Sequence, residues 1–394
     1  NAQIAACNTG VRRFSEMFER WPIDTVNNSM ASLMAYSERM TRLEIEKIPD
    51  GEYFFEDWLD DNAIDAHSDP IRIAVTMRVD GAEIEFDFNG TGAQVDSAIN
   101  NVMSSTASVV YYIVRTLTGD EIANNDGCYR PIKIVAPEGT IVNCSYPAPV
   151  ASRGLSLFRI EDVVNGVMGL AIPQRMTAAH SGQYNMVSVS GTNPSSGRTM
   201  IGHLGGPVVG GHGARPGKDG IDVTSHGCVN GTIVAMEIGE ARYPMIFRKM
   251  KLWEDSGGAG RFRGGLGYHA EVEWLEGDAD ITFRRERMKY QPWGIDGGGK
   301  APTGRTQIVR RDNDAPENLP GKTQLPIRSG ERLLYWITGS GGHGNPNERD
   351  PKMVLEDVLN GRVSVERARE DYGVVICDDT LDSEATATLR DGMN

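Results

Sequence analysis

The sequence of 394 residues lacks several features that would point at once to a class of protein. Its five cysteines include no CxxC pair, so we expect reduced thiols and no structural zinc site of that type. No apolar run approaches the roughly 18 residues that span a membrane, and residues 1–14 lack the layout of a signal peptide. The 40 basic and 54 acidic residues give a net charge of −14 without a basic stripe. These absences predict a cytoplasmic protein that binds neither nucleic acid nor membrane.

Glycine, by contrast, is abundant in the second half of the chain. The tracts 202–220, 255–267 and 339–351 are glycine-rich without low-complexity repetition, and five of the seven histidines lie in this half. Glycine weakens helices and strands but permits close backbone approach. We therefore expect irregular loops, held in place by the rest of the fold, that turn corners or surround a ligand.

The pattern of apolar residues predicts an α+β protein with an antiparallel-sheet-rich body, long glycine-rich loops and helices at both ends. Helices are expected at 2–20, 23–43, 97–117, 158–171 and, in the tail, within 350–373. Strands are expected at 52–60, in a hairpin at 71–79 and 82–90, and in a strand-turn-strand unit at 130–143. From 185 onward short strands separate the glycine tracts, and they include 232–238, TIVAMEI. We divide the chain into an N-terminal helical hairpin and α+β region, 1–183, and a β-rich glycine-loop region with a helical tail, 184–394.

Two segments imitate nucleotide-binding motifs. Residues 339–344 match GxGxxG, but Asn345-Pro346 stands where the required helix would begin. Residues 294–300 approach the phosphate-loop spacing, but Ala301 replaces the hydroxyl residue that would hold magnesium. We interpret both as loops, and the chain therefore has no recognisable ATP site of its own.

The densest group of chemically useful side chains lies in and just after the first glycine tract. Histidine and aspartate can move protons, and arginine can hold a carboxylate or phosphate through its forked donors. An alternative is that these are solvated loop residues. The group consists of His212, Arg215, Asp219 and His226.

Other charged side chains have simpler interpretations. Glu237 and Glu240 can flank a substrate, but a place at a strand edge is favoured. Arg284, Arg285 and Arg287 are expected to pair with the acidic surplus, with an anionic substrate or a partner subunit as alternatives.

Long segments spread over nearly the whole chain resemble the B-type subunits of ATP-dependent hydantoinases, 5-oxoprolinases and related ketone carboxylases of the acetone and acetophenone type. They include YSERMTRLEIEKIPDGEY (36–53), FNGTGAQVDSAIN (88–100), NNDGCYRPIKIVAPEGTIVNCSYPAPV (124–150), DSGGAGRFRGGLG (255–267), PWGIDGG (292–298) and residues 341–375.

The resemblance implies a hetero-oligomeric complex. An A-type partner with a kinase-like fold would use ATP and Mg²⁺ to phosphorylate the amide oxygen of a small-molecule substrate, and the B-type part would complete ring opening. The sequence begins at Asn1 within an expected helix, so we expect the C-terminal portion of a B-type subunit. Its upstream segment, which in this family has motifs resembling ligands for a divalent metal, would be a separate or missing chain. No metal ligand is assigned to this chain.

The expected function is therefore hydrolysis of a cyclic amide of the hydantoin or 5-oxoproline class. Alternatives are a subunit of an ATP-dependent ketone carboxylase and a non-catalytic scaffold. For catalysis we select His212, Asp219 and Asp126, and for substrate binding Arg215 and Arg130.

Overall fold

The computed structural model describes residues 1–393 except 184–185, 205, 207–209, 230 and 232–233. It confirms the α+β class: helices stand at both ends, and most strand pairs between them are antiparallel. No helix in the described part of the chain is long and apolar enough to cross a membrane.

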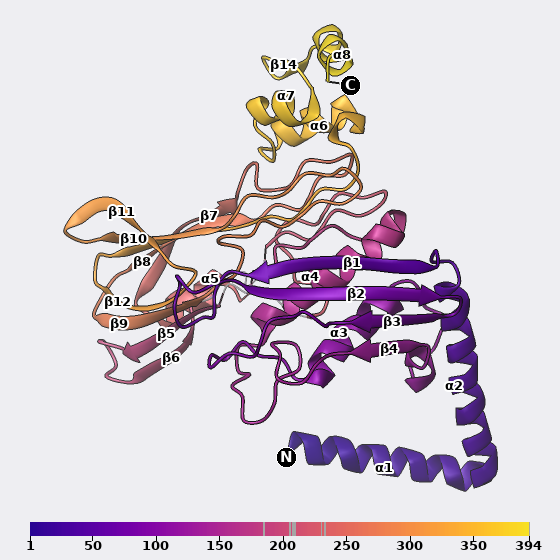
Figure 1. Cartoon of the computed structure of the whole chain (residues 1–394). Coiled ribbons are helices and arrows are strands. Elements are labelled where there is room, and N and C mark those ends of the chain that lie inside the picture. Colours follow the sequence, from indigo (N-terminus) through magenta and orange to yellow (C-terminus); the bar gives the residue numbers. More distant parts are fainter. Residues whose placement is uncertain (184–185, 205, 207–209, 230, 232–233, 394) are drawn as a thin grey trace.

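An arm of two helices opens the chain (Figure 1). Helix α1 (Ala2–Arg20) and helix α2 (Ile23–Ile45) meet at Trp21-Pro22, because proline lacks the N–H that would continue a helix. Helix α1 has no buried residue, whereas α2 buries Val26 near its start and Ser37, Thr41 and Ile45 nearer its end. The short helix η1 (Asp126–Tyr129) packs against α2.

A four-stranded sheet follows, in the order β1-β2-β3-β4. Strands β1 (Gly51–Leu59), β2 (Ile71–Asp80) and β3 (Glu83–Asp87) are antiparallel, and β4 (Ile132–Val135) runs parallel to β3. The expected hairpin is present, but the strand-turn-strand unit of 130–143 is reduced to β4.

Two helices cover this sheet. Helix α3 (Met103–Arg115) begins later than expected, and α4 (Gly154–Ala171) packs on β1 and β2. Helix α4 is buried along most of its length, and it contributes Val163, Val164 and Val167 to a core shared with the sheet. Helix η2 (Pro173–Arg175) follows it.

Two further sheets share a second core, as in a β-sandwich. One has the order β12-β9-β5-β6, from β5 (Met186–Thr192), β6 (Thr199–His203), β9 (Asp278–Arg284) and β12 (Lys322–Arg328). The other has the order β11-β10-β13-β8-β7, from β7 (Met245–Leu252), β8 (Tyr268–Trp274), β10 (Arg305–Arg310), β11 (Asn313–Leu319) and β13 (Arg332–Ile337).

The strand expected at 232–238 is wrong in its described part. Residues 236–238 begin helix α5 (Met236–Arg242), and 232–233 lie outside the described residues. An apolar run this short does not distinguish strand from helix by periodicity. The helix is favoured here because Met, Glu and Ala are good helix formers.

The tail contains the expected helices with their capping residues. Helix α6 (Pro351–Leu359) is capped by Asp350, and α7 (Val365–Tyr372) is capped by Ser364 and ends at Gly373 in the left-handed conformation. Helix η3 (Pro346–Glu348) precedes them, and β14 (Ile376–Cys377), β15 (Thr380–Leu381) and α8 (Ser383–Asp391) follow. Figure 1 shows this tail as a small separate layer with its own core around Val354 and Tyr372.

The glycine tracts form loops that pack backbone against backbone. A Cβ at position 213 would lie 1.9 Å from the carbonyl oxygen of Ala178, and one at position 211 would lie 2.0 Å from that of Gly265. Glycine is required at both positions, because only a residue without Cβ allows such an approach. Residues 339–344 are loop as expected and cross the same region.

Candidate functional site

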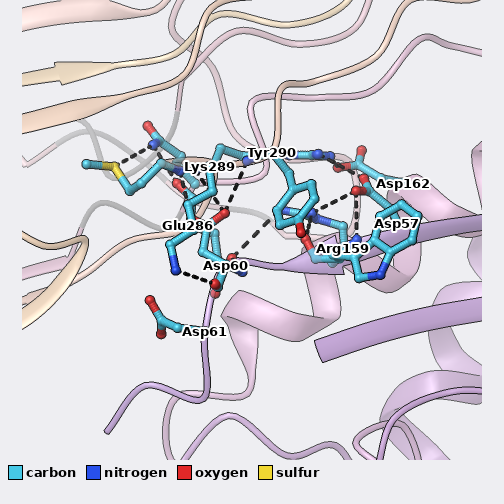
Figure 2. Close-up of polar contacts among 12 residues, drawn as sticks. Asp57, Asp60, Asp61, Arg159, Asp162, Glu286, Lys289 and Tyr290 are labelled. Atoms are coloured by element: carbon cyan, nitrogen blue, oxygen red, sulfur yellow. Dashed lines mark hydrogen bonds and ion pairs between the residues drawn. The ribbon is translucent and has the colours of Figure 1, made fainter. Parts of the chain in front are cut away.

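Buried charged side chains join the first sheet to the loops that follow β9 (Figure 2). Asp57 accepts from Arg159 of α4 at 3.0 Å and from Arg287 at 2.8 Å. The carboxylate of Asp60 accepts from the backbone N–H of Met288 at 2.7 Å. Burial would raise the pKa of Asp57, but Arg159 and Arg287 lower it below its usual value, so the carboxylate is ionised.

Asp162 extends this network toward a histidine. Its Oδ2 accepts from Arg287, and its Oδ1 accepts from the backbone N–H of His180 at 3.0 Å. Since α4 is anchored on the sheet, this bond fixes the loop that carries His180.

The preceding residue on α4, Glu161, lies in a cluster with two histidines. Nδ1 of His226 lies 2.5 Å from Oε2 of Glu161, and Nε2 of His180 lies 3.4 Å from Oε1. All three side chains are buried, and the ring of His226 stacks on Phe158 with centroids 4.2 Å apart. Burial would raise the pKa of Glu161, but the adjacent imidazoles hold it well below its usual value.

The backbone determines where His180 carries its proton. The backbone N–H of Gly213 donates to Nδ1 of His180 at 2.8 Å. Because that nitrogen must offer its lone pair, the ring is neutral and its proton lies on Nε2, facing Glu161.

This tautomer argues against a metal at the cluster. Glu161, His180 and His226 do bring three potential ligand atoms within 4.8 Å of one another. A metal-bound histidine donates through its other nitrogen, whereas His180 accepts there and has no lone pair left on Nε2. The three residues therefore do not fit a three-ligand metal site.

A cavity of about 390 Å³ adjoins the cluster. Its lining comes from α3, α4 and the first glycine tract, and a volume of this size accommodates a small molecule. A hollow of about 650 Å³ in the tail has no buried acid-imidazole cluster and carries no comparable chemistry. The residues around the smaller cavity include Tyr112, Glu161, Asn165, Arg175, Thr177, His180, His212 and Arg215.

Two of the residues selected from the sequence line this cavity. The ring of His212 lies 3.9 Å from that of His180, and burial with the neighbouring His180 lowers the pKa of His212 to about 3. His212 is therefore neutral at physiological pH. The guanidinium of Arg215 has no hydrogen bond or ion pair to any described residue, so it is available to an anionic ligand.

The other three lie elsewhere. Asp219 accepts from Arg349 at 2.7 and 2.8 Å and from the backbone N–H of Arg263. Asp126 lies 3.2 Å from Arg130, which also reaches Glu38 of α2. None of the three is among the residues that line the cavity. The catalytic and binding roles of all five stay predictions.

The remaining charged residues lie outside the cavity. Glu237 and Glu240 lie on helix α5 and not at a strand edge as expected; Glu237 is exposed, and Glu240 accepts from the backbone N–H of Phe247. Arg287 pairs with acids as expected, but Arg285 lies between the rings of Phe283 and Tyr335. Arg284 donates to Ser152.

Glu161 and His180 were missed from the sequence. The available signal was the run of charges in α4, LFRIEDVVNGVMGLA, where Arg159, Glu161 and Asp162 interrupt an otherwise apolar helix. Such residues are rarely buried without partners, so three of them in a core helix indicate a polar site.

The fold defined by these layers occurs in ATP-dependent enzymes. The crystal structure of ATP-dependent caprolactamase from Pseudomonas jessenii superposes with a TM-score of 0.87 at 29% identity, covering 99% of this chain and 68% of that one. Acetone carboxylase in its nucleotide-free structure gives 0.83 at 19% identity, covering 99% and 58%, which shows a shared fold.

The sequence comparison agrees. The family model described as hydantoinase B/oxoprolinase matches residues 1–346. The B-type subunit of a putative D-/L-hydantoinase from Pseudomonas sp. (strain NS671) is 35% identical over 402 residues, covering 99% of this chain and 67% of that protein. The beta subunit of caprolactamase from P. jessenii is 30% identical, covering 99% of this chain and 68% of that protein.

The chain therefore belongs to the hydantoinase B/oxoprolinase family, and it spans about two thirds of the length of these relatives. Both relatives are named as one subunit of an enzyme, which implies a partner subunit.

Proposed function

We propose that the chain is part of the B-type subunit of an ATP-dependent hydrolase of cyclic amides, of the hydantoin or 5-oxoproline class. The observation that carries the proposal is the cavity beside α4, which is lined by buried Glu161 and His180 and by Arg215, whose guanidinium has no partner among the described residues. Hydantoinase and caprolactamase among the relatives support the substrate class.

The division of labour follows from amide chemistry. An amide is a poor electrophile, and phosphorylation converts its oxygen into a leaving group. A kinase-like A-type partner would perform that step with ATP and Mg²⁺, and this cavity would receive the activated ring. Arg215 would hold its phosphate or a carboxylate, since guanidinium donors match either group.

A reconstituted complex tests the proposal. Hydantoin, 5-oxoproline and caprolactam should each be assayed for ATP consumption with and without bicarbonate. Ring opening that needs ATP but not bicarbonate is the expected result. Replacement of His212 or Arg215 by Ala should lower turnover, and unchanged turnover in both variants would contradict their assignment to the site.

The second candidate is a subunit of an ATP-dependent ketone carboxylase, which the fold shared with acetone carboxylase favours. Strict dependence of ATP consumption on bicarbonate would establish it and exclude the hydrolase.

A further inference from the structure

We propose that Oε1 of Glu161 accepts a hydrogen bond from the ring nitrogen of the substrate and directs the activated ring to open at its carbon–nitrogen bond. This inference rests on the proposed function, because it requires a cyclic amide in the cavity beside α4. It adds a contact for the ring nitrogen of the substrate, which Oε1 of Glu161 would hold, to the contact proposed above between Arg215 and the phosphate or carboxylate.

The two oxygens of Glu161 differ in their partners. Oε2 accepts from Nδ1 of His226 at 2.5 Å and from the backbone N–H of Cys228 at 3.2 Å. Oε1 makes no well-aligned hydrogen bond to a described residue, since its nearest donor, Nε2 of His180, lies 3.4 Å away, and the side chain is fully buried. An unsatisfied buried acceptor costs about 1–3 kcal/mol, and more when it is charged. A ligand that supplies the missing donor would remove that cost.

The surroundings of Oε1 suit an amide nitrogen. Nε2–H of His180 lies 3.4 Å away and is a donor, by the tautomer assigned above. A Cβ at position 227 would lie 2.6 Å from Oε1 and 2.5 Å from the hydroxyl oxygen of Tyr112, so both oxygens face the same point. Oε1 can accept a hydrogen bond and the neighbouring Nε2–H of His180 can donate one. Together they complement an amide, in which the N–H and the oxygen are attached to the same carbon. A ketone has no N–H to offer.

This contact influences which bond of the reaction intermediate breaks, the carbon–nitrogen bond of the ring or the carbon–oxygen bond to phosphate. Phosphorylation of the amide oxygen leaves the proton on the ring nitrogen, so the activated ring keeps an N–H. Water then adds to the carbon and loses one proton to solvent, which gives a tetrahedral carbon bearing hydroxyl, phosphate and the ring N–H. If the nitrogen takes a proton from solvent, the carbon–nitrogen bond breaks and its electron pair goes to nitrogen. The hydroxyl loses its proton to form an acyl phosphate, which a second water hydrolyses to carboxylate and phosphate.

The competing path wastes ATP. If the carbon–oxygen bond to phosphate breaks first, phosphate leaves, the hydroxyl loses its proton and the original amide is restored. A fixed negative oxygen beside the nitrogen stabilises the positive charge that nitrogen acquires on protonation. Oε1 of Glu161 therefore favours ring opening over loss of phosphate.

The experiment measures coupling in the reconstituted complex with 5-oxoproline or caprolactam in oxygen-18 water. In the wild type, ATP consumption should match ring opening closely. Glu161→Gln keeps the shape but removes the charge, so the ratio of ring opening to loss of phosphate should fall by about 10-fold or more, as for loss of a hydrogen bond to a charged group. Each wasted cycle leaves an oxygen from water in the amide, so recovered substrate should gain oxygen-18.

A second variant leaves the carboxylate intact. The methyl group of Gly227→Ala would lie against Oε1 and block the substrate nitrogen, and it should uncouple the complex in the same way. Glu237→Gln, on the exposed surface of α5, is the matched control and should stay coupled.

The inference is overturned if ATP consumption and ring opening fall in equal proportion in folded Glu161→Gln or Gly227→Ala, with no oxygen-18 in recovered substrate. Failure of the proposed function looks different, because the wild-type complex would then show no ATP consumption stimulated by any cyclic amide.

Discussion

Arg287 donates a hydrogen bond to Asp57 at 2.8 Å, although 230 positions separate the two residues. The same guanidinium reaches Asp162, whose carboxylate holds the backbone of His180. One arginine from the loop after β9 thus braces both the edge of the first sheet and the histidine beside the cavity.

Removal of this arginine should destabilise the protein strongly. Arg287→Ala leaves Asp57 and Asp162 buried with fewer cations, and breaking a buried ion pair typically costs about 3–5 kcal/mol. Urea unfolding followed by circular dichroism measures this loss. Arg332→Ala, which breaks a partly exposed pair with Glu271, is the control and should cost at most about 1 kcal/mol. Equal losses in the two variants would contradict the bracing role.

His212 should contribute to the acid sensitivity of the fold. Its pKa is about 3 in the folded protein because burial and His180 disfavour the charged ring, whereas an unfolded histidine titrates near about 6.5. The unfolded state therefore binds more protons as pH falls from about 6.5 toward 3, and stability falls with it.

His212→Asn should make that pH dependence shallower by up to one proton, as measured by unfolding at a series of pH values. His67→Asn, at an exposed loop residue, serves as the control variant. A His212→Asn slope identical to that of the wild type would show that the folded ring takes up its proton normally.

Gly213→Ala should disrupt the cavity. The added methyl would lie 1.9 Å from the carbonyl oxygen of Ala178, so the loop must shift and withdraw the N–H that His180 accepts. We expect a loss of about 3 kcal/mol or more, in the range for forced overpacking with a lost buried hydrogen bond. Gly10→Ala in α1, with nothing within 4 Å, should instead stabilise the helix by about 0.5–1 kcal/mol. Thermal unfolding of both variants distinguishes the two effects.

Substitution of Asp219 distinguishes a role in proton transfer from a structural role. Its carboxylate is held by Arg349, and although burial opposes ionisation this arginine lowers its pKa. Asp219→Asn should therefore cost about 2 kcal/mol, less than a fully buried pair because the side chain is 26% exposed.

The stabilisation from Asp219 should be present above the usual aspartate range and disappear as pH falls through its lowered folded pKa. A large drop in kcat with unchanged stability would favour the proton-transfer role predicted from the sequence instead.

The helices could be predicted because their signals are local. Pro22 ends α1, Asp350 and Ser364 cap α6 and α7, and Gly373 closes the tail. Strand β11 could not be predicted because it is almost wholly exposed and lacks apolar alternation. It is a strand because it pairs with β10, and the local sequence pattern does not indicate such a pairing.

The candidate site could be predicted only in part for a similar reason. His212 and Arg215 lie together in one tract, so the sequence already groups them. Glu161 and His180 come from a core helix and the loop beyond it, and His226 reaches them from 65 positions beyond Glu161. Sequence spacing cannot reveal a cluster that only the folded backbone assembles.

The backbone-to-backbone packing at Gly211 and Gly213 also limits how this protein can be re-engineered. Main chains packed this closely leave no room for a larger side chain at either position, and any insertion there would separate the two loops. Variation of substrate size must then come from other cavity-lining positions, such as Tyr112, Thr116 and Met176, whose side chains can be replaced. A library confined to those positions would explore new specificities while leaving the folding of the loops untouched.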